Sequence, residues 1–254
     1  MYMEERVGLS PFDRYRFDVA GYLLFDDVLD TGQVATLKDA IEARLPSPPG
    51  PSVMEQRFWA EFLGWHPRCR DLIDHPLVLD VLDDLIGPYA RLDHAYGIVM
   101  APGQTGLGLH GPDWPFDPAQ FYVYRGGRIR SGLLSFSWAL TTAVPGEGGF
   151  GCIPGSHRAE EPIPEGADAL VVEVAQRAGS LLVFTEALAH CTIPWTAPEI
   201  RLSLLYKYSP GSSAWSPHAA VPADVLPRLT PRQRRLVEPP YVGGRKPSLD
   251  ADRL

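Results

Sequence analysis

The chain has 254 residues, 45% of them hydrophobic and 21% charged, with a formal net charge of −8. This composition is that of a globular protein and excludes a disordered chain, and no apolar stretch approaches the roughly 18 residues that a membrane span needs. For want of such a stretch, a membrane is not an expected partner. An acidic chain would be repelled by a phosphate backbone, so nucleic acid is not expected either.

The first third of the chain predicts helices. Asp30 with Gln33 three residues on is a capping-box pattern, and Val34, Leu37 and Ile41 then recur at helical spacing until the proline-rich segment 46–51 ends the helix. Pro76 suits the first turn of a second helix that runs to about Gly87. The intervening region 54–72 is also expected to be helical.

From residue 92 the chain changes to short apolar or alternating runs separated by glycine and proline, which is typical of strands. The runs cover residues 92–100, 132–141, 150–153, 170–175, 180–185 and 201–208. They predict a mainly β, α+β domain in which helices cover one side of a jelly-roll double sheet.

We interpret residues 1–254 as a single domain with a helical part at about 30–88, a β core at about 92–210 and a C-terminal tail at 211–254. The late basic cluster, from Arg228 to Lys246, is expected on the solvated surface of that tail. Three cysteines without C-x-x-C spacing predict neither a disulfide framework nor a structural zinc site, and the expected location is the cytoplasm.

Two histidines, His110 and His190, each stand where a predicted strand meets a turn. Arg201 opens a later apolar strand, with Ser203 on the same strand face. An imidazole pair that holds a metal and an Arg-x-Ser pair that holds a carboxylate are what a non-haem iron oxygenase requires.

The sequence resembles a known family in three ordered segments: PGEGGFGCIPGSH at 145–157, GSLLVF at 179–184, and then His190 and Arg201. These resemble the phytanoyl-CoA dioxygenase family of iron(II)/2-oxoglutarate-dependent oxygenases, over about residues 17–210. The resemblance implies a double-stranded β-helix that uses iron(II), 2-oxoglutarate and O₂. It makes His110 and His190 iron ligands, and makes Arg201 the anchor of the far carboxylate of 2-oxoglutarate. From their positions near Arg201 and His190, Ser203 and Thr192 are expected to supply further hydrogen-bonding groups.

One position departs from the family pattern. The family carries its third iron ligand, a carboxylate, two residues after the first histidine, but here that position is Pro112. Asp113 would supply the oxygen if the turn bulges by one residue, and Glu186 would reach the metal from four residues before His190. A third possibility is that no carboxylate completes the site, as in related halogenases. Asp117 is a weaker fourth candidate.

Aromatic residues near the two histidines are expected to line the substrate pocket: Trp114, Phe116, Tyr122, Trp138 and Trp195. Trp138 is also interpretable as a core residue, and His157 is expected to be structural. The predicted function is oxidation, most often hydroxylation, of an unactivated C–H bond in a small organic molecule or natural-product intermediate. The alternatives are halogenation, desaturation or cyclisation by the same iron, and a metal-free binding protein that keeps the jelly roll.

Overall fold

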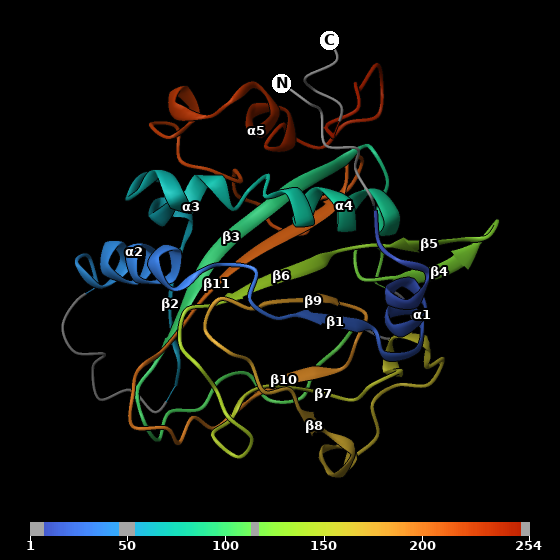
Figure 1. Ribbon diagram of the computed structural model, residues 1–254. Coiled ribbons are helices and arrows are strands. Elements are labelled where there is room, and N and C mark those ends of the chain that lie inside the picture. Colours follow the sequence, from blue (N-terminus) through green and yellow to red (C-terminus); the bar gives the residue numbers. More distant parts are fainter. Residues whose placement is uncertain (1–7, 46–53, 113–116, 250–254) are drawn as a thin grey trace.

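Two antiparallel sheets face each other in the computed structural model, which describes residues 8–45, 54–112 and 117–249 (Figure 1). The larger has six strands in the order β1 (Tyr22–Phe25), β9 (Leu181–Thr185), β6 (Leu134–Ala139), β11 (Arg201–Pro210), β3 (Ala90–Met100) and β2 (Gln56–Phe58). The smaller has the order β10 (His190–Ile193), β7 (Gly149–Cys152) and β8 (Val172–Glu173). The expected double-stranded β-helix is confirmed.

A separate two-stranded hairpin, β4 (Tyr122–Arg125) and β5 (Arg128–Ser131), lies beside the two sheets. The helices are α1 (Pro11–Ala20), α2 (Thr31–Glu42), α3 (Pro67–Asp71), α4 (Pro76–Leu85) and α5 (Pro231–Leu236). Short 3₁₀ turns are η1 (Ala60–Gly64), η2 (Ser156–Arg158), η3 (Ala167–Leu170) and η4 (Leu226–Arg228). None of the helices within the described residues is long and apolar enough to cross a membrane.

The central strand β11 shows how the sequence divides the two faces of the large sheet. Side chains alternate along a strand, so Arg201, Ser203 and Lys207 share one face and Tyr206 and Tyr208 share the other. The tyrosine face packs against the helices, where the two hydroxyls donate to the carbonyls of Cys69 and Ile73 at 2.6 and 2.7 Å. The polar face therefore points into the space between the sheets.

Helices α2, α3, α4 and α5 cover the outer face of the large sheet, opposite β7, β8 and β10 (Figure 1). The predicted cap of α2 is confirmed, because the Asp30 side chain accepts from the Gln33 backbone at 2.8 Å and the Gln33 side chain accepts from the Asp30 backbone at 2.9 Å. The proline-rich segment 46–51 that was expected to end this helix lies outside the described residues. Helix α4 begins at Pro76, as predicted, and buries an apolar stripe against the sheet.

Two expectations about the chain outside the β core hold only in part, since η1 and α3 do lie within the region 54–72 that was expected to be helical. Within the region 54–72, residues 56–58 form strand β2 rather than helix, and β2 pairs with β3 at the edge of the large sheet. The C-terminal region is not simply a solvated tail, because Leu236 of α5 is fully buried and the Gln233 side chain donates to Arg70 and Asp74. Apolar burial and side-chain hydrogen bonds to α3 and its flank hold α5 in place.

Candidate metal and cosubstrate site

The two predicted histidines are brought together by direct backbone pairing. His110 and His190 form an isolated antiparallel bridge, in which each N–H donates to the other carbonyl at 3.0 and 2.8 Å. Their ring centroids lie 4.2 Å apart. This pairing connects the loop after β3 to β10 and places both imidazoles on the same side of the bridge.

The ring nitrogens of both histidines are oriented by backbone carbonyls. Nδ1 of His110 is 2.8 Å from the Gly108 carbonyl, and Nδ1 of His190 is 2.7 Å from the Leu188 carbonyl. A carbonyl oxygen only accepts, so both Nδ1 atoms carry a proton, and a metal would be bound through the Nε2 atoms. Burial lowers the pKa of His190 to about 4 despite the opposing charge of Glu186, so this ring is neutral at pH 7. Two imidazoles oriented this way suit a divalent transition metal.

Glu186 lies beside the histidine pair, on the buried segment that leads into β10. Its Oε2 is 4.0 Å from Nε2 of His190, while Oε1 accepts from Lys207 Nζ at 2.9 Å and from the Ser135 hydroxyl. Burial by itself raises the pKa of Glu186, but Lys207, His190 and these hydrogen bonds outweigh burial and lower it to about 2. Glu186 is therefore an ionised carboxylate with one oxygen engaged and the other facing His190.

The third ligand of the expected triad is not formed by the arrangement of the described residues. Among residues 8–45, 54–112 and 117–249, no group of three His, Cys, Asp or Glu side chains is positioned to hold a metal ion. Pro112 occupies the family's carboxylate position, and Asp113 lies outside the described residues. Asp117 uses Oδ1 to accept from the backbone N–H groups of Ala119 and Gln120.

Arg201 is a buried cation without a carboxylate partner in the part of the chain that the structure describes. It is 7% exposed, and its one hydrogen bond there is to the sulfur of Met100 at 3.3 Å. Burial lowers its pKa, and the nearby Glu55 and Tyr96 oppose that effect. Glu55 is itself ion-paired with Arg57 at 2.6 Å. A buried guanidinium of this kind favours an anionic ligand.

Thr192 lies between the histidine pair and Arg201 along the small sheet. It stands two residues after His190 on the same face of β10 and pairs with Phe150, while Arg201 lies against the adjacent Gly149. A Cβ on Gly149 would lie 3.4 Å from Nε of Arg201, so the glycine permits this approach. Ser203 is buried one alternation further along β11. The predicted cosubstrate groups thus share the interior of the β-helix.

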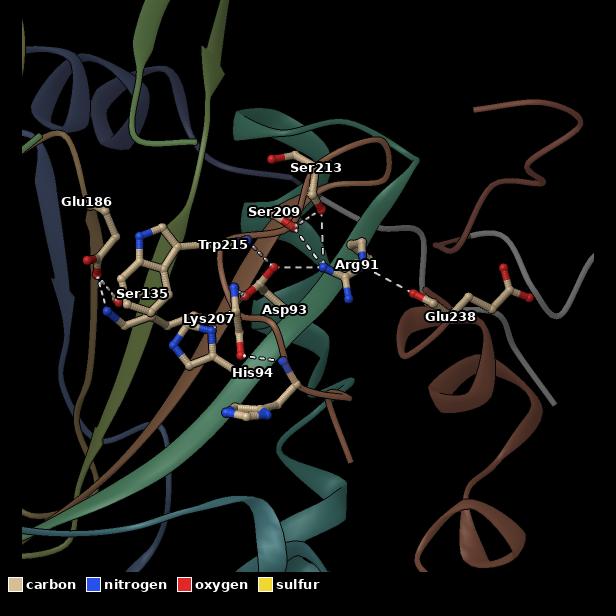
Figure 2. Close-up of polar contacts among 12 residues, drawn as sticks. Arg91, Asp93, His94, Ser135, Glu186, Lys207, Ser209, Ser213, Trp215 and Glu238 are labelled. Atoms are coloured by element: carbon tan, nitrogen blue, oxygen red, sulfur yellow. Dashed lines mark hydrogen bonds and ion pairs between the residues drawn. The ribbon is translucent and has the colours of Figure 1, made fainter. Parts of the chain in front are cut away.

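Sequence reasoning missed several polar residues of this interior. Lys207 contacts Glu186 and lies over the rings of Tyr96 and Trp215 at 5.6 and 5.9 Å (Figure 2). The signal that could have found Lys207 is its place on the Arg201–Ser203 face of an otherwise apolar strand. Glu55 accepts a 3.3 Å hydrogen bond from Thr192, but nothing in the sequence connects these two residues.

A second polar network lies next to Lys207. Asp93 pairs with Arg91 at 2.8 Å and with His94 at 2.7 Å, and accepts from the backbone N–H groups of Trp215 and Ser216 (Figure 2). His94 stacks between Tyr96 and Trp215, with centroid separations of 5.9 and 5.3 Å. This network fixes the segment carrying Trp215 against the end of β3.

The aromatic residues predicted to line the pocket lie in different places. Trp138 is fully buried on the helix-facing side of β6, where it contacts His75 edge-to-face, so it belongs to the core and is wrong as a pocket residue. Trp195 is fully buried in an interior cluster with Tyr96 and Met100. The Tyr122 hydroxyl donates to Asp18, and its ring lines a cavity described below. Trp114 and Phe116 lie outside the described residues.

A cavity of about 1180 Å³ opens beside the histidine pair. Pro112, Ala187 and Ala189 belong to its wall and stand next to the segments that carry His110, Glu186 and His190. In the amide orientation that satisfies its neighbours, Gln120 of this wall donates to the Glu186 carbonyl at 3.1 Å and accepts from the Trp215 indole at 3.0 Å.

Comparison with known proteins identifies the family. Residues 17–203 match the sequence model of the family described as Phytanoyl-CoA dioxygenase (PhyH). The chain belongs to the phytanoyl-CoA dioxygenase family. The resemblance drawn from the sequence is therefore confirmed, as is the prediction of an Fe(II)/2-oxoglutarate-dependent oxygenase. No curated protein matches the chain.

Solved structures similar to this PhyH-family chain carry the same fold at low identity. HygX from Streptomyces hygroscopicus, with nickel and 2-oxoglutarate bound, is 23% identical with a TM-score of 0.73, covering 86% of this chain and 94% of its own. The carbocyclase SnoK from nogalamycin biosynthesis is 20% identical with a TM-score of 0.63, covering 97% and 99%. The epimerase SnoN, in complex with Fe³⁺, alpha ketoglutarate and nogalamycin RO, is 21% identical with a TM-score of 0.64, covering 91% and 95%.

Proposed function

We propose that this PhyH-family protein binds Fe(II) through Nε2 of His110 and His190, and 2-oxoglutarate through Arg201, and oxidises a C–H bond of a small natural-product intermediate. The observation that carries the proposal is the pair of imidazoles whose Nδ1 atoms are held by carbonyls. Bound Fe(II) and 2-oxoglutarate would supply the oxidant by coupling the reduction of O₂ to conversion of the cosubstrate into succinate and carbon dioxide. The residues of the chain would bind and orient the metal, the cosubstrate and the substrate, and would keep water out of the site.

The role of Arg201 follows from its surroundings. A guanidinium that is 7% exposed and has no carboxylate within ion-pair distance among the described residues is costly until an anion arrives. The distal carboxylate of 2-oxoglutarate would pair with it through two parallel N–H donors. Thr192 and Ser203 supply hydroxyl groups on neighbouring interior positions. Arg201 thereby fixes the cosubstrate at one end while its keto-acid end faces the histidines.

For the third iron ligand we propose Glu186 or Asp113. Glu186 already presents Oε2 toward Nε2 of His190, at 4.0 Å. Two ligand atoms at right angles on a metal with bonds of about 2.1 Å stand about 3 Å apart, so Glu186 would have to approach by about 1 Å. Lys207 and Ser135 hold its other oxygen, and this opposes the movement. Asp113 requires a one-residue bulge after Pro112.

The Fe(II) affinities of two variants separate these ligands. Anaerobic titration of Glu186→Gln and of Asp113→Asn with Fe(II) should show at least a tenfold loss of affinity for the true ligand and little change for the other. An unchanged affinity in both variants would favour an iron held by the two histidines alone. Circular dichroism of both variants controls for misfolding.

Hydroxylation is the proposed outcome, and the relatives widen the alternatives. HygX has been crystallised with nickel, 2-oxoglutarate and hygromycin B, SnoK is a carbocyclase and SnoN an epimerase. Ring closure, desaturation or halogenation by the same iron is therefore the second candidate. The motivating observation is Pro112 at the carboxylate position, because a missing ligand leaves room for halide.

A direct test is the conversion of 2-oxoglutarate to succinate under Fe(II) and O₂, with His110→Gln and Arg201→Met as comparisons. Wild-type protein should form succinate slowly even without substrate, and both variants should form at least a hundredfold less. Adding chloride and analysing products of a natural-product panel separates hydroxylation from halogenation. Wild-type protein that neither takes up Fe(II) nor forms succinate would instead support a metal-free binding protein.

A further inference from the structure

The cavity beside the histidine pair has a chemical character that the proposed chemistry does not use. It measures about 1180 Å³, slightly more than the roughly 300–1,000 Å³ typical of small-molecule sites. Ile153, Ile163 and Leu170 contribute apolar side chains to its wall. Ile163 and Leu170 are 40% and 61% exposed, which leaves apolar surface available to a ligand. A multi-ring molecule would fit and would bury this surface.

The charged groups on the wall are all acidic. Asp117, Glu160 and Glu161 line the cavity, and the described lining contains neither lysine nor arginine. Arg158 lies between the wall residues His157 and Ala159 in sequence, and its guanidinium pairs with Asp18 and lies over the Tyr122 ring at 5.5 Å. Arg158 is therefore already neutralised by a carboxylate. The field inside the cavity favours a positive charge.

The cavity borders the residues proposed to hold the metal. Ala187 of its wall directly follows Glu186, and Ala189 directly precedes His190. Gly111, directly after His110, lies against Ile163 and Ala189, since a Cβ there would stand 3.4 and 3.5 Å from them. A molecule seated in this cavity therefore lies against the segments that carry the histidine pair.

From this geometry we propose that the cavity is the substrate site and that the substrate is an amine-bearing, multi-ring molecule whose protonated amine lies near Glu160 and Glu161. The assignment of a substrate rests on the oxygenase function proposed above, whereas the selectivity for a cation rests on the cavity alone. The apolar wall binds the ring body, and the carboxylates bind the ammonium group. This assignment narrows the substrate class from natural products in general to basic ones.

Binding of two matched fluorescent probes tests the inference. Dansylcadaverine carries an apolar ring system and a primary amine, and its N-acetyl derivative keeps the ring system but has no charge. Wild-type protein should bind dansylcadaverine about tenfold more tightly than the acetylated probe at low salt, and added NaCl should reduce the difference. Glu160→Gln combined with Glu161→Gln should weaken dansylcadaverine about three- to tenfold and leave the acetylated probe unchanged.

A matched control comes from the same loop. Glu165→Gln combined with Asp168→Asn removes the same charge from exposed positions that do not line the cavity, and should change neither affinity more than twofold. Equal binding of both probes, no binding of either, or an equal effect of the two double variants would overturn the inference. Fe(II) titration of the same samples keeps the two claims separate. Protein that keeps the probe selectivity but binds no iron would refute the oxygenase proposal alone. Protein that binds iron but does not prefer the cationic probe would refute the cation site alone.

Discussion

Replacing Arg201 by methionine should stabilise the protein without ligands while removing its affinity for 2-oxoglutarate. Methionine keeps an unbranched side chain of similar length and carries no charge. The guanidinium of Arg201 is 7% exposed, and its one hydrogen bond within the described residues is to the Met100 sulfur. Folding therefore removes water from this charge and replaces it with only one weak interaction. Removing the charge removes that cost.

The size of both effects follows from the burial. Replacing buried charge with an apolar side chain of similar volume is often stabilising by about 1–4 kcal/mol, and for a lone cation we expect about 1–3 kcal/mol. For a chain of this length that raises the melting temperature by about 2–4 °C per kcal/mol. Losing the charge-assisted pair with the cosubstrate costs about 2–5 kcal/mol, which weakens 2-oxoglutarate binding from about 30-fold to several thousand-fold.

Thermal unfolding with and without cosubstrate measures both quantities on the same sample. With Fe(II) under anaerobic conditions, 2-oxoglutarate at 100 times its Kd should stabilise wild-type protein by about 2.7 kcal/mol and leave Arg201→Met unaffected at that concentration. Arg91 is the matched control, because it is equally buried but pairs with Asp93 at 2.8 Å. Arg91→Met should lose about 3–5 kcal/mol, since it leaves Asp93 buried without its cation.

Two results would refute this reasoning. If Arg201→Met destabilises the ligand-free protein as Arg91→Met does, Arg201 has a structural partner and is not a vacant anion site. If the variant keeps the affinity of wild type for 2-oxoglutarate, Arg201 does not hold the cosubstrate.

Three further predictions concern the fold. Gly97→Ala should lower the free energy of unfolding by about 1–3 kcal/mol, because its Cβ would stand 1.9 Å from the Phe58 ring. In a double-mutant cycle, Phe58→Leu should recover part of that loss, and additive effects of the two substitutions would contradict the clash. Asp30→Ala should lower the free energy of unfolding by about 1 kcal/mol through loss of the α2 cap, and an unchanged denaturant midpoint would contradict this. Burial by itself raises the pKa of Asp93, but hydrogen bonds from His94, Trp215 and Ser216 lower it to about 2. The ionised Asp93 therefore stabilises the folded protein above pH 3.8, the pKa of the unfolded chain, and this stabilisation is lost as the pH falls from 3.8 toward 2. Asp93→Asn should flatten the dependence of the free energy of unfolding on pH in this range. An unchanged slope there would contradict the prediction.

The sequence predicted the helices and strands that are marked by residues close together along the chain. The Asp30–Gln33 capping box, the proline at the start of α4 and the apolar run of β11 all depend on neighbours close in sequence, and all three are found in the structure. Ser10 and Pro11 carry an equally local signal for α1, which lies outside the helical region predicted from about residue 30. The three-residue strand β2 has no periodicity of its own and exists because it pairs with β3.

The candidate site also contains residues that the sequence predicted and features that depend on tertiary structure. Strand position indicated that His110, His190, Arg201 and Ser203 were candidates, and the structure brings the two histidines into direct backbone pairing. The face on which Trp138 lies depends on which side of β6 the helices cover, and this is a tertiary property. Likewise, the ion pair of Lys207 with Glu186 joins residues 21 positions apart. Glu186 directly follows β9 and Lys207 lies on β11, and these two strands are not neighbours in the sheet.

The central claim is that two imidazoles and one guanidinium hold a metal and a keto-diacid inside the β-helix. A crystal grown anaerobically with Fe(II) and 2-oxoglutarate tests it most directly. We expect an iron anomalous peak at about 2.1 Å from Nε2 of both His110 and His190, and the distal carboxylate of 2-oxoglutarate paired with Arg201. Iron bound elsewhere, or a cosubstrate whose distal carboxylate leaves Arg201 without a partner, would contradict the account.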